Sequence, residues 1–279
     1  MTENSFSADT KPDVQTPPAV PDNLFAETVT EVEHYTDSLF RFRITRPASF
    51  RFRSGEFVMI GLPETVTGAK SVFRAYSIAS PSWDETLEFF SIKVPDGPLT
   101  EHLQNIVPGD TILMRKKPTG TLVLDALLPG KRLWMISTGT GFAPFASLVR
   151  DPEAYEKFET LITTHTCRYV DELRYSQDTV AATQDDPLVG ELAANRLQLI
   201  TSTTRDNHPL TGRITTLLQD GSLYRHLDIG ELDPEHDRVM ICGSMAMLKD
   251  VRAIVEAAGF VEGANNKPGT FVVERAFVG

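Results

Sequence analysis

The chain has 279 residues, of which 41% are hydrophobic and 23% charged, which is enough apolar material for two domains of roughly 100–150 residues each. Its formal net charge of −11, from 27 basic and 38 acidic side chains, argues against general affinity for nucleic acid or anionic lipid. Two cysteines, Cys167 and Cys242, are too few for a disulfide scaffold, a four-thiolate zinc site or a Cys-ligated iron–sulfur cluster, and we expect no bound metal.

Residues 1–22 are polar and rich in proline, and they predict a disordered arm. They do not show a positive start followed by an apolar core, and we find no apolar run of about 18 residues in the chain. We therefore expect a protein without a signal peptide or membrane span that is cytoplasmic, a location that the low cysteine content also favours.

Residues 23–128 show short strand patterns separated by Gly and Pro turns. Apolar and charged residues alternate at 40–44 and again at 50–53, as in half-buried strands. We expect further strands at 57–60, 71–78, 86–94, 111–114 and 122–124, and a short helix at 98–105. The spacing of the turns favours an antiparallel β-barrel.

Residues 129–279 change to strands that alternate with helices. We expect strands at 133–136, 160–165, 197–202, 238–242 and 270–275. Helices are expected at 144–158, 171–183, 214–219 and 245–258. This alternation predicts an α/β domain built on a doubly wound parallel sheet, which follows the barrel.

The loop after the first strand of the second domain is rich in small residues: Thr138, Gly139, Thr140 and Gly141. Small residues let backbone amides approach a pyrophosphate, although a tight strand–helix turn alone explains the pattern equally well. The spacing matches neither GxGxxG nor a P-loop, which disfavours phosphoryl transfer.

Polar residues follow the next two strands of this domain, namely Arg168, Thr204 and Arg205, with Arg213 shortly after. Guanidinium groups pair well with phosphate oxygens, so three arginines near neighbouring strand ends suggest a site for a 2′-phosphate. Any one of these arginines is better explained as a solvated surface residue, and only their common placement at strand ends favours the site.

Two segments of the barrel carry residue types that suit a flat heterocycle and a diphosphate. The first runs Arg74, Ala75, Tyr76, Ser77, in which an arginine can hold phosphate, a tyrosine can stack and a serine can hydrogen-bond a ring nitrogen. The second contains Ile92, Lys93 and Val94, and then Gly97 and Thr100 at the start of the expected short helix. The alternative is an ordinary strand followed by a turn.

Taken in order, these motifs resemble the bacterial type of ferredoxin–NADP(+) reductase (flavodoxin/ferredoxin–NADP reductase family). The match runs from Phe25 to Gly279 and includes the RxYS segment, the GPLT turn, the TGTG loop, the CGS turn and the ending ERAFVG. The resemblance implies a flavin-binding barrel followed by an NADP-binding domain. It also implies electron transfer between NADPH and ferredoxin or flavodoxin through FAD, in a chain that we expect to be monomeric.

In the barrel, the resemblance places Arg74 on the FAD pyrophosphate, Tyr76 on the isoalloxazine ring and Ser77 at flavin N5. It places Ile92, Lys93 and Val94 along the flavin, and Gly97 and Thr100 on the diphosphate.

In the second domain, the resemblance places Thr138, Gly139, Thr140 and Gly141 at the NADP pyrophosphate and nicotinamide, and Arg168, Arg205 and Arg213 at the 2′-phosphate. It places Cys242 beside nicotinamide C4 and Glu274 on a proton path to the flavin. The tail continues past the aromatic end of plastid-type members, and the resemblance to the bacterial type places Ala276 over the isoalloxazine and Phe277 near the adenine.

Two other functions fit the same two domains: a stand-alone NAD(P)H-dependent flavin reductase of an oxygenase system, and a flavin-binding regulatory protein without turnover. A carrier would dock on local positive charge, because the net charge is negative. The candidates for such a basic rim are Arg41, Arg43, Arg51, Arg53, Arg115, Lys116 and Lys117, for which solvated strand faces are the alternative.

Overall fold

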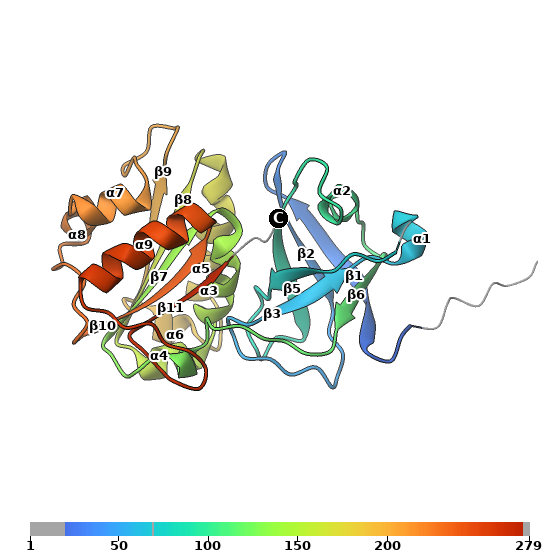
Figure 1. Cartoon of the computed structure of the whole chain (residues 1–279), viewed down its shortest axis with the longest axis horizontal. Coiled ribbons are helices and arrows are strands. Elements are labelled where there is room, and N and C mark those ends of the chain that lie inside the picture. Colours follow the sequence, from blue (N-terminus) through green and yellow to red (C-terminus); the bar gives the residue numbers. More distant parts are fainter. Residues whose placement is uncertain (1–19, 69, 276–279) are drawn as a thin grey trace, which may run out of the picture.

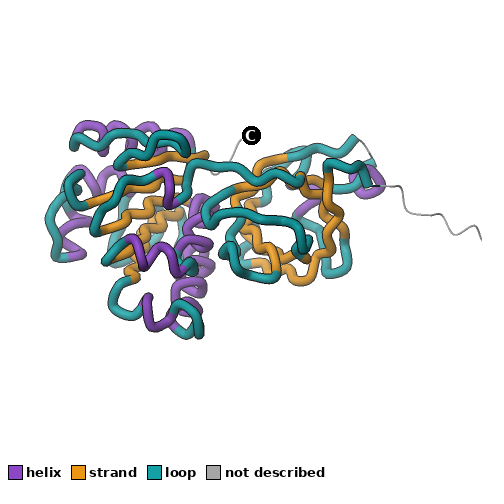
Figure 2. Tube along the Cα trace, turned by 90° about the horizontal axis from the view of Figure 1, so that it is seen from below, coloured by secondary structure: helices purple, strands orange, loops and turns teal. Residues whose placement is uncertain are grey.

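The structure, a computed structural model, describes residues 20–68 and 70–275 and arranges them as two domains side by side (Figures 1 and 2). The first domain is an antiparallel barrel and the second is a parallel sheet between helices, as the sequence predicts. Most of the predicted amino-terminal arm lies outside the described residues. No helix in the described part of the chain is long and apolar enough to cross a membrane.

Six antiparallel strands form the barrel, in the order β4-β3-β6-β1-β2-β5. They are β1 (Leu24–His34), β2 (Leu39–Thr45), β3 (Phe57–Gly61), β4 (Arg74–Ser77), β5 (Thr86–Ile92) and β6 (Thr111–Arg115). Two short helices, α1 (Glu64–Thr67) and α2 (Thr100–Leu103), lie in the connections. In β2, Phe40, Phe42 and Ile44 are fully buried while the arginines between them face outward, so the alternation in the sequence is the alternation of the strand's two faces.

The first and last strands of this sheet, β4 and β5, curl toward each other and almost close the barrel. The Ala79 N–H donates to the Glu88 carbonyl (2.8 Å), and the hydroxyls of Tyr76 and Ser91 are 3.2 Å apart. Strand β4 pairs only with β3 among the described strands. A seam therefore remains between β4 and β5, and the backbone edges that face it are free for a ligand.

The second domain has five parallel strands in the order β11-β10-β7-β8-β9. They are β7 (Arg132–Thr138), β8 (Thr160–Cys167), β9 (Leu197–Thr203), β10 (Asp237–Gly243) and β11 (Phe271–Arg275). The helices are α3 (Ala143–Leu148), α4 (Pro152–Lys157), α5 (Arg174–Gln184), α6 (Gly190–Ala193), α7 (Ile214–Gln219), α8 (Ser222–Leu227) and α9 (Met245–Ala257), with 3₁₀ turns at Leu124–Ala126, Gly139–Phe142 and Asp171–Leu173.

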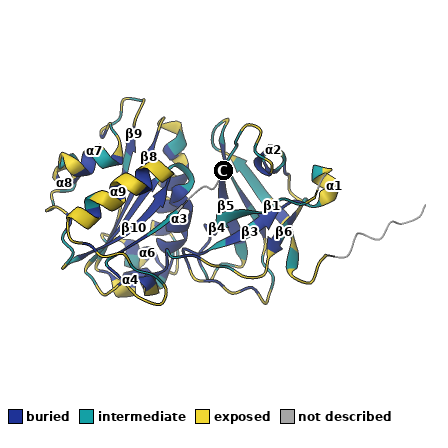
Figure 3. Ribbon diagram, in the orientation of Figure 1, coloured by how far each residue is buried: buried dark blue, intermediate teal, exposed yellow. Residues whose placement is uncertain are grey.

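Each face of this sheet has its own core, and the outer faces of the helices are exposed (Figure 3). Helices α7, α8 and α9 pack on one face. Helices α3 to α6 pack on the other, in a core that also takes in Leu39, Ala79 and Phe90 from the barrel. The two domains therefore share apolar core on the α3 and α5 side.

Two expected strands are wrong, because buried apolar residues do not by themselves make a strand. Residues 50–53 bury Phe50 and Phe52, but the Arg46 guanidinium donates to the Phe50 carbonyl (3.0 Å), where a strand partner would bond. Residues 122–124 lead into the 3₁₀ turn Leu124–Ala126, and they are buried against the second domain.

The expected helix at 144–158 is two helices, α3 and α4. Pro152 has no N–H to continue a helix, and it occupies the first turn of α4. The Asp151 side chain accepts the Glu153 N–H (3.0 Å) and caps the new start.

Candidate functional site

A cavity of about 210 Å³ lies at the seam between β4 and β5. Its wall comprises Arg74, Ala75, Tyr76, Ser77, Phe90, Ser91, Ile92, Val94, Pro95, Asp96, Gly97, Pro98, Leu99, Thr100, Thr140 and Ala143. The structure thus brings together all the predicted flavin residues of the described barrel except Lys93, whose N–H donates to the Ser38 carbonyl instead (2.7 Å). Pockets for whole drug-sized ligands enclose roughly 300–1,000 Å³, so this cavity suits the ring of a dinucleotide, with the rest lying outside it.

Tyr76 is the aromatic wall of this cavity. Its ring packs edge-on against Phe89, with centroids 6.3 Å apart at 87°, and against Phe42. Burial raises the pKa of Tyr76 to about 12, although the hydrogen bond with Ser91 opposes this rise. The phenol therefore stays neutral, in a fixed orientation suited to packing against a flat ring.

The turn beyond β5 forms the other end of the cavity. The Thr100 hydroxyl donates to the Val94 carbonyl (3.2 Å), and a Cβ on Gly97 would lie 2.2 Å from that hydroxyl oxygen. Only glycine fits at this position without displacing Thr100. The Arg74 guanidinium and this tight turn, near an aromatic wall, fit the diphosphate and ring of a flavin dinucleotide.

The second candidate site lies at the carboxyl ends of β7 and β10. The chain runs from β7 outward to β8 and β9 and then returns to β10, so the connections diverge between β7 and β10, where open α/β sheets bind ligands. The loop at 138–141 leaves β7 there, and a Cβ on Gly141 would lie 2.3 Å from the Cys242 carbonyl oxygen. Backbone thus approaches backbone across the crevice, so a side chain at residue 141 would collide with β10.

The loops of the two domains meet at the flavin cavity. Thr140 and Ala143 belong to the second domain, yet they line the same cavity as Tyr76 and Ser77. The sequence analysis did not identify Ala143, Phe90 or Ser91 as site residues. Phe90 and Ser91 reach the cavity because β5 curls toward β4, and Ala143 reaches it because α3 of the second domain packs there. None of these contacts leaves a pattern in the local sequence.

Cys242 and Glu274 are neighbours in register on β10 and β11. Burial, with a smaller effect of the Glu274 charge, raises the pKa of the Cys242 thiol well above its usual range, so the thiol is protonated and is a poor nucleophile. Cys242 is fully buried. Its backbone carbonyl, rather than its thiol, lies against Gly141 at the crevice.

Glu274 faces a wider cleft of about 740 Å³ between the barrel loop at 119–121 and helix α9. Its Oε2 accepts the Thr121 N–H (2.9 Å), and its buried Oε1 has no hydrogen-bond partner among residues 20–68 and 70–275. Burial raises the pKa of this carboxyl to about 7, and the charge of Glu56 adds to the rise. The group can therefore take up or release a proton near neutral pH.

The predicted phosphate-binding arginines lie at the ends of β8 and β9. The Arg205 N–H donates to the Arg168 carbonyl (3.0 Å), and the Gly212 N–H to the Thr203 carbonyl (2.8 Å), which brings Arg213 to the same turn. All three arginines are exposed, and none forms an ion pair within the described residues. Arg205 lies over the Tyr169 ring and donates to its hydroxyl (2.9 Å), so Tyr169 is a site candidate that the sequence analysis missed.

Ion pairs with glutamates neutralise part of the predicted basic rim. Arg41 pairs with Glu31 (2.5 Å) and Glu33 (2.9 Å), and Arg43 pairs with Glu88 (2.8 Å). These two arginines therefore do not offer free charge to a partner. Other members of the set, including Lys116 and Lys117, are exposed.

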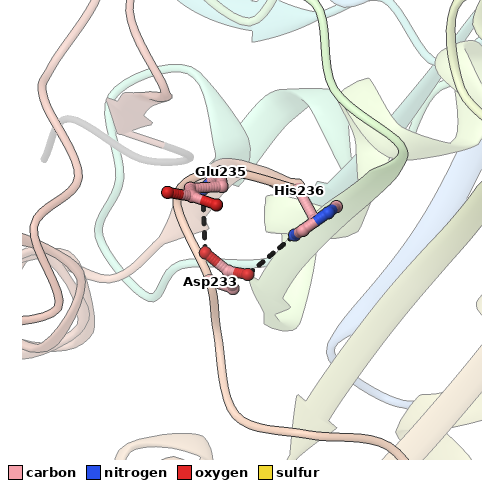
Figure 4. A group of neighbouring side chains, drawn as sticks. All are labelled: Asp233, Glu235 and His236. Carbon is pink, nitrogen blue, oxygen red and sulfur yellow. Dashed lines mark hydrogen bonds and ion pairs between the residues drawn. The ribbon is translucent and has the colours of Figure 1, made fainter.

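One cluster of metal-ligand types occurs among the described residues: Asp233, Glu235 and His236 (Figure 4). The Asp233 carboxylate accepts the Glu235 N–H (2.9 Å) and contacts His236 Nδ1 (2.7 Å). These are the bonds of a turn that precedes β10, at the opposite end of the sheet from the candidate site. The predicted contacts of Ala276 and Phe277 fall outside the described residues.

A flavin-type cavity in a barrel, joined to a nucleotide-type crevice in an α/β domain, defines a two-domain flavin- and nicotinamide-dependent oxidoreductase. Family models agree: residues 27–123 match the oxidoreductase FAD-binding domain, and residues 135–253 match the oxidoreductase NAD-binding domain.

Individual proteins that are similar over nearly the whole chain place it more closely within this class of oxidoreductase. A flavodoxin/ferredoxin–NADP reductase of Rhodobacter capsulatus is 56% identical over 95% of this chain and 98% of its own length. Ferredoxin–NADP reductase A of Sorangium cellulosum is 51% identical over 91% of this chain and 90% of its own length. The crystal structure of a ferredoxin NADP⁺ reductase from Neisseria gonorrhoeae with bound FAD and NADP superposes with a TM-score of 0.82 at 34% identity, covering 91% of this chain and 99% of that one.

The chain belongs to the flavodoxin/ferredoxin–NADP reductase family. The predicted family, the enzyme class and the FAD and nicotinamide cofactors are thereby confirmed.

Proposed function

We propose that this chain transfers electrons between NADPH and a one-electron carrier, ferredoxin or flavodoxin, through FAD bound at the seam of the barrel. The observation that carries the proposal is the shared cavity, in which Thr140 and Ala143 of the nucleotide domain lie against the same space as Tyr76 and Ser77. A nicotinamide held by the loop at 138–141 would thus be adjacent to a ring held by the barrel.

The barrel residues bind and orient the flavin in this proposal. Tyr76 stacks on the ring, Ser77 hydrogen-bonds its N5, and Arg74 holds the pyrophosphate. Ile92 and Val94 contact the flavin largely through backbone, while the N–H of Lys93 between them is turned to Ser38. Gly97 and Thr100 close on the diphosphate. The fit rests on the aromatic wall, the donors around the cavity and the tight turn at Gly97.

The second domain binds and orients the nucleotide. Thr138, Gly139, Thr140 and Gly141 face its pyrophosphate and nicotinamide, while Arg168, Thr204, Arg205 and Arg213 hold the 2′-phosphate. The three exposed arginines support this assignment, because their guanidinium groups form no ion pair within the described part of the chain. Ala276 and Phe277 cover the flavin and adenine in the same proposal.

FAD, when bound, supplies the conversion between a hydride and single electrons. The chain itself orients the two cofactors and holds or releases a proton. The Cys242 thiol packs as a neutral wall beside the nicotinamide, and Glu274, with a pKa of about 7, holds or releases a proton at Oε1. Positioning of this kind is worth several orders of magnitude in rate.

Anaerobic titration of the FAD-loaded protein with NADPH tests the proposal. We expect the flavin absorbance to bleach with NADPH and much less with NADH, and we expect NADPH oxidation to follow added ferredoxin or flavodoxin. Ser77→Ala should retain FAD and slow the bleaching, whereas Ser71→Ala, outside the cavity wall, should bleach at the normal rate. A spectrum that NADPH leaves unchanged would favour a non-turnover flavin protein and overturn the proposal.

We further propose that the chain acts as a monomer in the cytoplasm. Both cysteines are free and buried, which suits a reducing compartment. Sedimentation of the FAD-loaded protein checks the first point, and a dimer mass at micromolar concentration would contradict it.

A further inference from the structure

His165 lies beneath the loop at 138–141, hereafter the nucleotide loop. It projects from β8 and is fully buried, on the same face of the strand as Cys167. Its Nε2 lies 2.9 Å from the Gly139 carbonyl oxygen, and its Nδ1 lies 2.8 Å from the Ser176 hydroxyl. The ring thus connects the first turn of α5 with the loop after β7.

The partners of the ring fix where its proton lies. A carbonyl oxygen only accepts, so the hydrogen bond to Gly139 requires a proton on Nε2. Burial lowers the pKa of His165 to about 4, so the ring is neutral at pH 7 and Nδ1 carries no proton. The Ser176 hydroxyl also lies 2.8 Å from the Leu173 carbonyl oxygen. With a proton on Nε2, its single proton goes to Nδ1 rather than to that carbonyl.

The remaining neighbours agree with this tautomer. The Cys167 sulfur lies 3.2 Å from Nε2. Burial holds the pKa of that thiol above its usual range, so it keeps its proton, and it can donate to the Glu172 carbonyl (3.7 Å). The Phe142 ring packs against the imidazole, with centroids 5.1 Å apart, and excludes water from one side.

Holding one carbonyl sets the direction of the adjacent N–H. Gly139 has a φ of +53°, and a Cβ there would meet nothing within 4 Å, so the loop backbone is open to the crevice at this residue. The Gly139 C=O and the Thr140 N–H share one trans peptide and point in opposite directions. A carbonyl turned inward to His165 therefore turns the Thr140 N–H outward.

We propose that His165 is a positioning residue for nucleotide binding: its Nε2–H holds the Gly139 carbonyl inward, so that the Thr140 N–H faces the pyrophosphate–nicotinamide part of NADP(H). The inference rests on the proposed function, because that function assigns the loop at 138–141 to this part of the nucleotide. His165 itself touches neither substrate nor flavin. It acts through the loop.

Two substitutions separate this role from mere packing. The amide nitrogen of Gln replaces Nε2 and can still donate to Gly139, whereas that of Asn replaces Nδ1 and reaches only toward Ser176. For the FAD-loaded protein we expect His165→Asn to weaken NADP⁺ binding about tenfold, because the loop carbonyl loses its donor. His165→Gln should stay within about threefold, and both variants should retain FAD.

Calorimetric titration with two ligands makes the test specific. The fragment 2′,5′-ADP carries the 2′-phosphate but lacks the nicotinamide half, so His165→Asn should change its Kd by no more than about twofold. Arg205→Ala serves as the reference and should weaken both ligands. Suppose that Arg205→Ala weakens the binding of both ligands, while His165→Asn and His165→Gln change the Kd of NADP⁺ equally. The positioning role of His165 is then wrong, and the proposed nucleotide site is still supported. If Arg205→Ala changes neither Kd, the proposed nucleotide site itself fails.

A spectroscopic readout tests the proton position directly. In protein labelled with ¹⁵N-histidine, with His165→Gln used for assignment, we expect a neutral Nε2–H ring whose shifts stay constant from about pH 6 to 8. A proton on Nδ1 would leave the Gly139 carbonyl without a donor and would overturn the proposal.

Discussion

Glu88 is the residue whose replacement should most damage the docking of the two domains. It lies on β5 with its side chain 4% exposed, and it faces Arg43 (2.8 Å) on the barrel. From the second domain, Arg150 (3.2 Å) and the Tyr175 hydroxyl (2.7 Å) reach the other carboxylate oxygen. We expect Glu88→Gln to remove the one negative charge that joins these groups.

The magnitude follows from the pKa of the buried carboxyl. Burial alone would raise it, but the charges of Arg150 and Arg43, with the hydrogen bond from Tyr175, outweigh burial and lower it from 4.5 to about 2. At roughly 1.4 kcal/mol per pH unit, this difference corresponds to about 3 kcal/mol of stability at neutral pH. Breaking a buried pair typically costs a similar amount.

Urea unfolding of the FAD-loaded protein at pH 7, followed by tryptophan fluorescence, measures this cost. Trp83 is a suitable reporter because its indole N–H donates to the Arg150 carbonyl (3.0 Å) across the same interface. The matched control is Glu31→Gln, which removes an ion pair of Arg41 at a side chain that is 46% exposed and should cost less than about 1 kcal/mol.

The pH dependence has a definite sign. The native pKa of Glu88 is depressed, so its stabilisation is complete above the unfolded value near 4.5 and disappears as the pH falls toward 2. The difference between the native protein and Glu88→Gln should therefore be constant from pH 7 to 5 and shrink below. If Glu88→Gln costs no more than Glu31→Gln at pH 7, the assigned role of the buried cluster is wrong.

Three other predictions concern the substrates. Arg205→Ala should raise the KM for NADPH about tenfold and leave NADH kinetics unchanged, because only NADPH carries the 2′-phosphate; an unchanged NADPH preference would exclude Arg205 from that site. Glu274→Gln should abolish an inflection near pH 7 in the rate of carrier reduction, because burial raises the carboxyl pKa to about 7, and a pH profile identical to the native one would contradict the proton role. Charge reversal at Lys116 and Lys117 should raise the KM for the carrier and spare NADPH-to-dye activity, and unchanged carrier kinetics would remove both lysines from the docking surface.

Local patterns predicted the parts of this fold that depend on local physics. Alternation identified β2. The run of small residues after β7 marked a tight loop, because a close backbone approach such as that of Gly141 to Cys242 demands them. The pattern failed at residues 50–53. There an arginine side chain, rather than a neighbouring strand, satisfies the backbone.

Partners distant in sequence explain the other differences. Arg43 was a candidate for a free basic rim, but its acceptor, Glu88, lies on another strand, and only their pairing shows that the charge is used internally. Likewise, the sequence shows His165 only as a polar residue in a buried strand. The structure adds its two partners, Gly139 and Ser176, on either side of the ring. Buried polar residues need partners, but a sequence does not name them.

Two of these distant pairings depend on successive residues at the start of α5. The Tyr175 hydroxyl donates to Glu88 of the barrel, and the Ser176 hydroxyl supports His165 beneath the nucleotide loop. Both side chains are buried where apolar residues would pack without needing partners. A displacement of this one helical turn would disturb the docking of the barrel and the orientation of the loop together. The two hydroxyls therefore tie the geometry of domain docking to the geometry of nucleotide binding, which is what hydride transfer across a domain boundary requires.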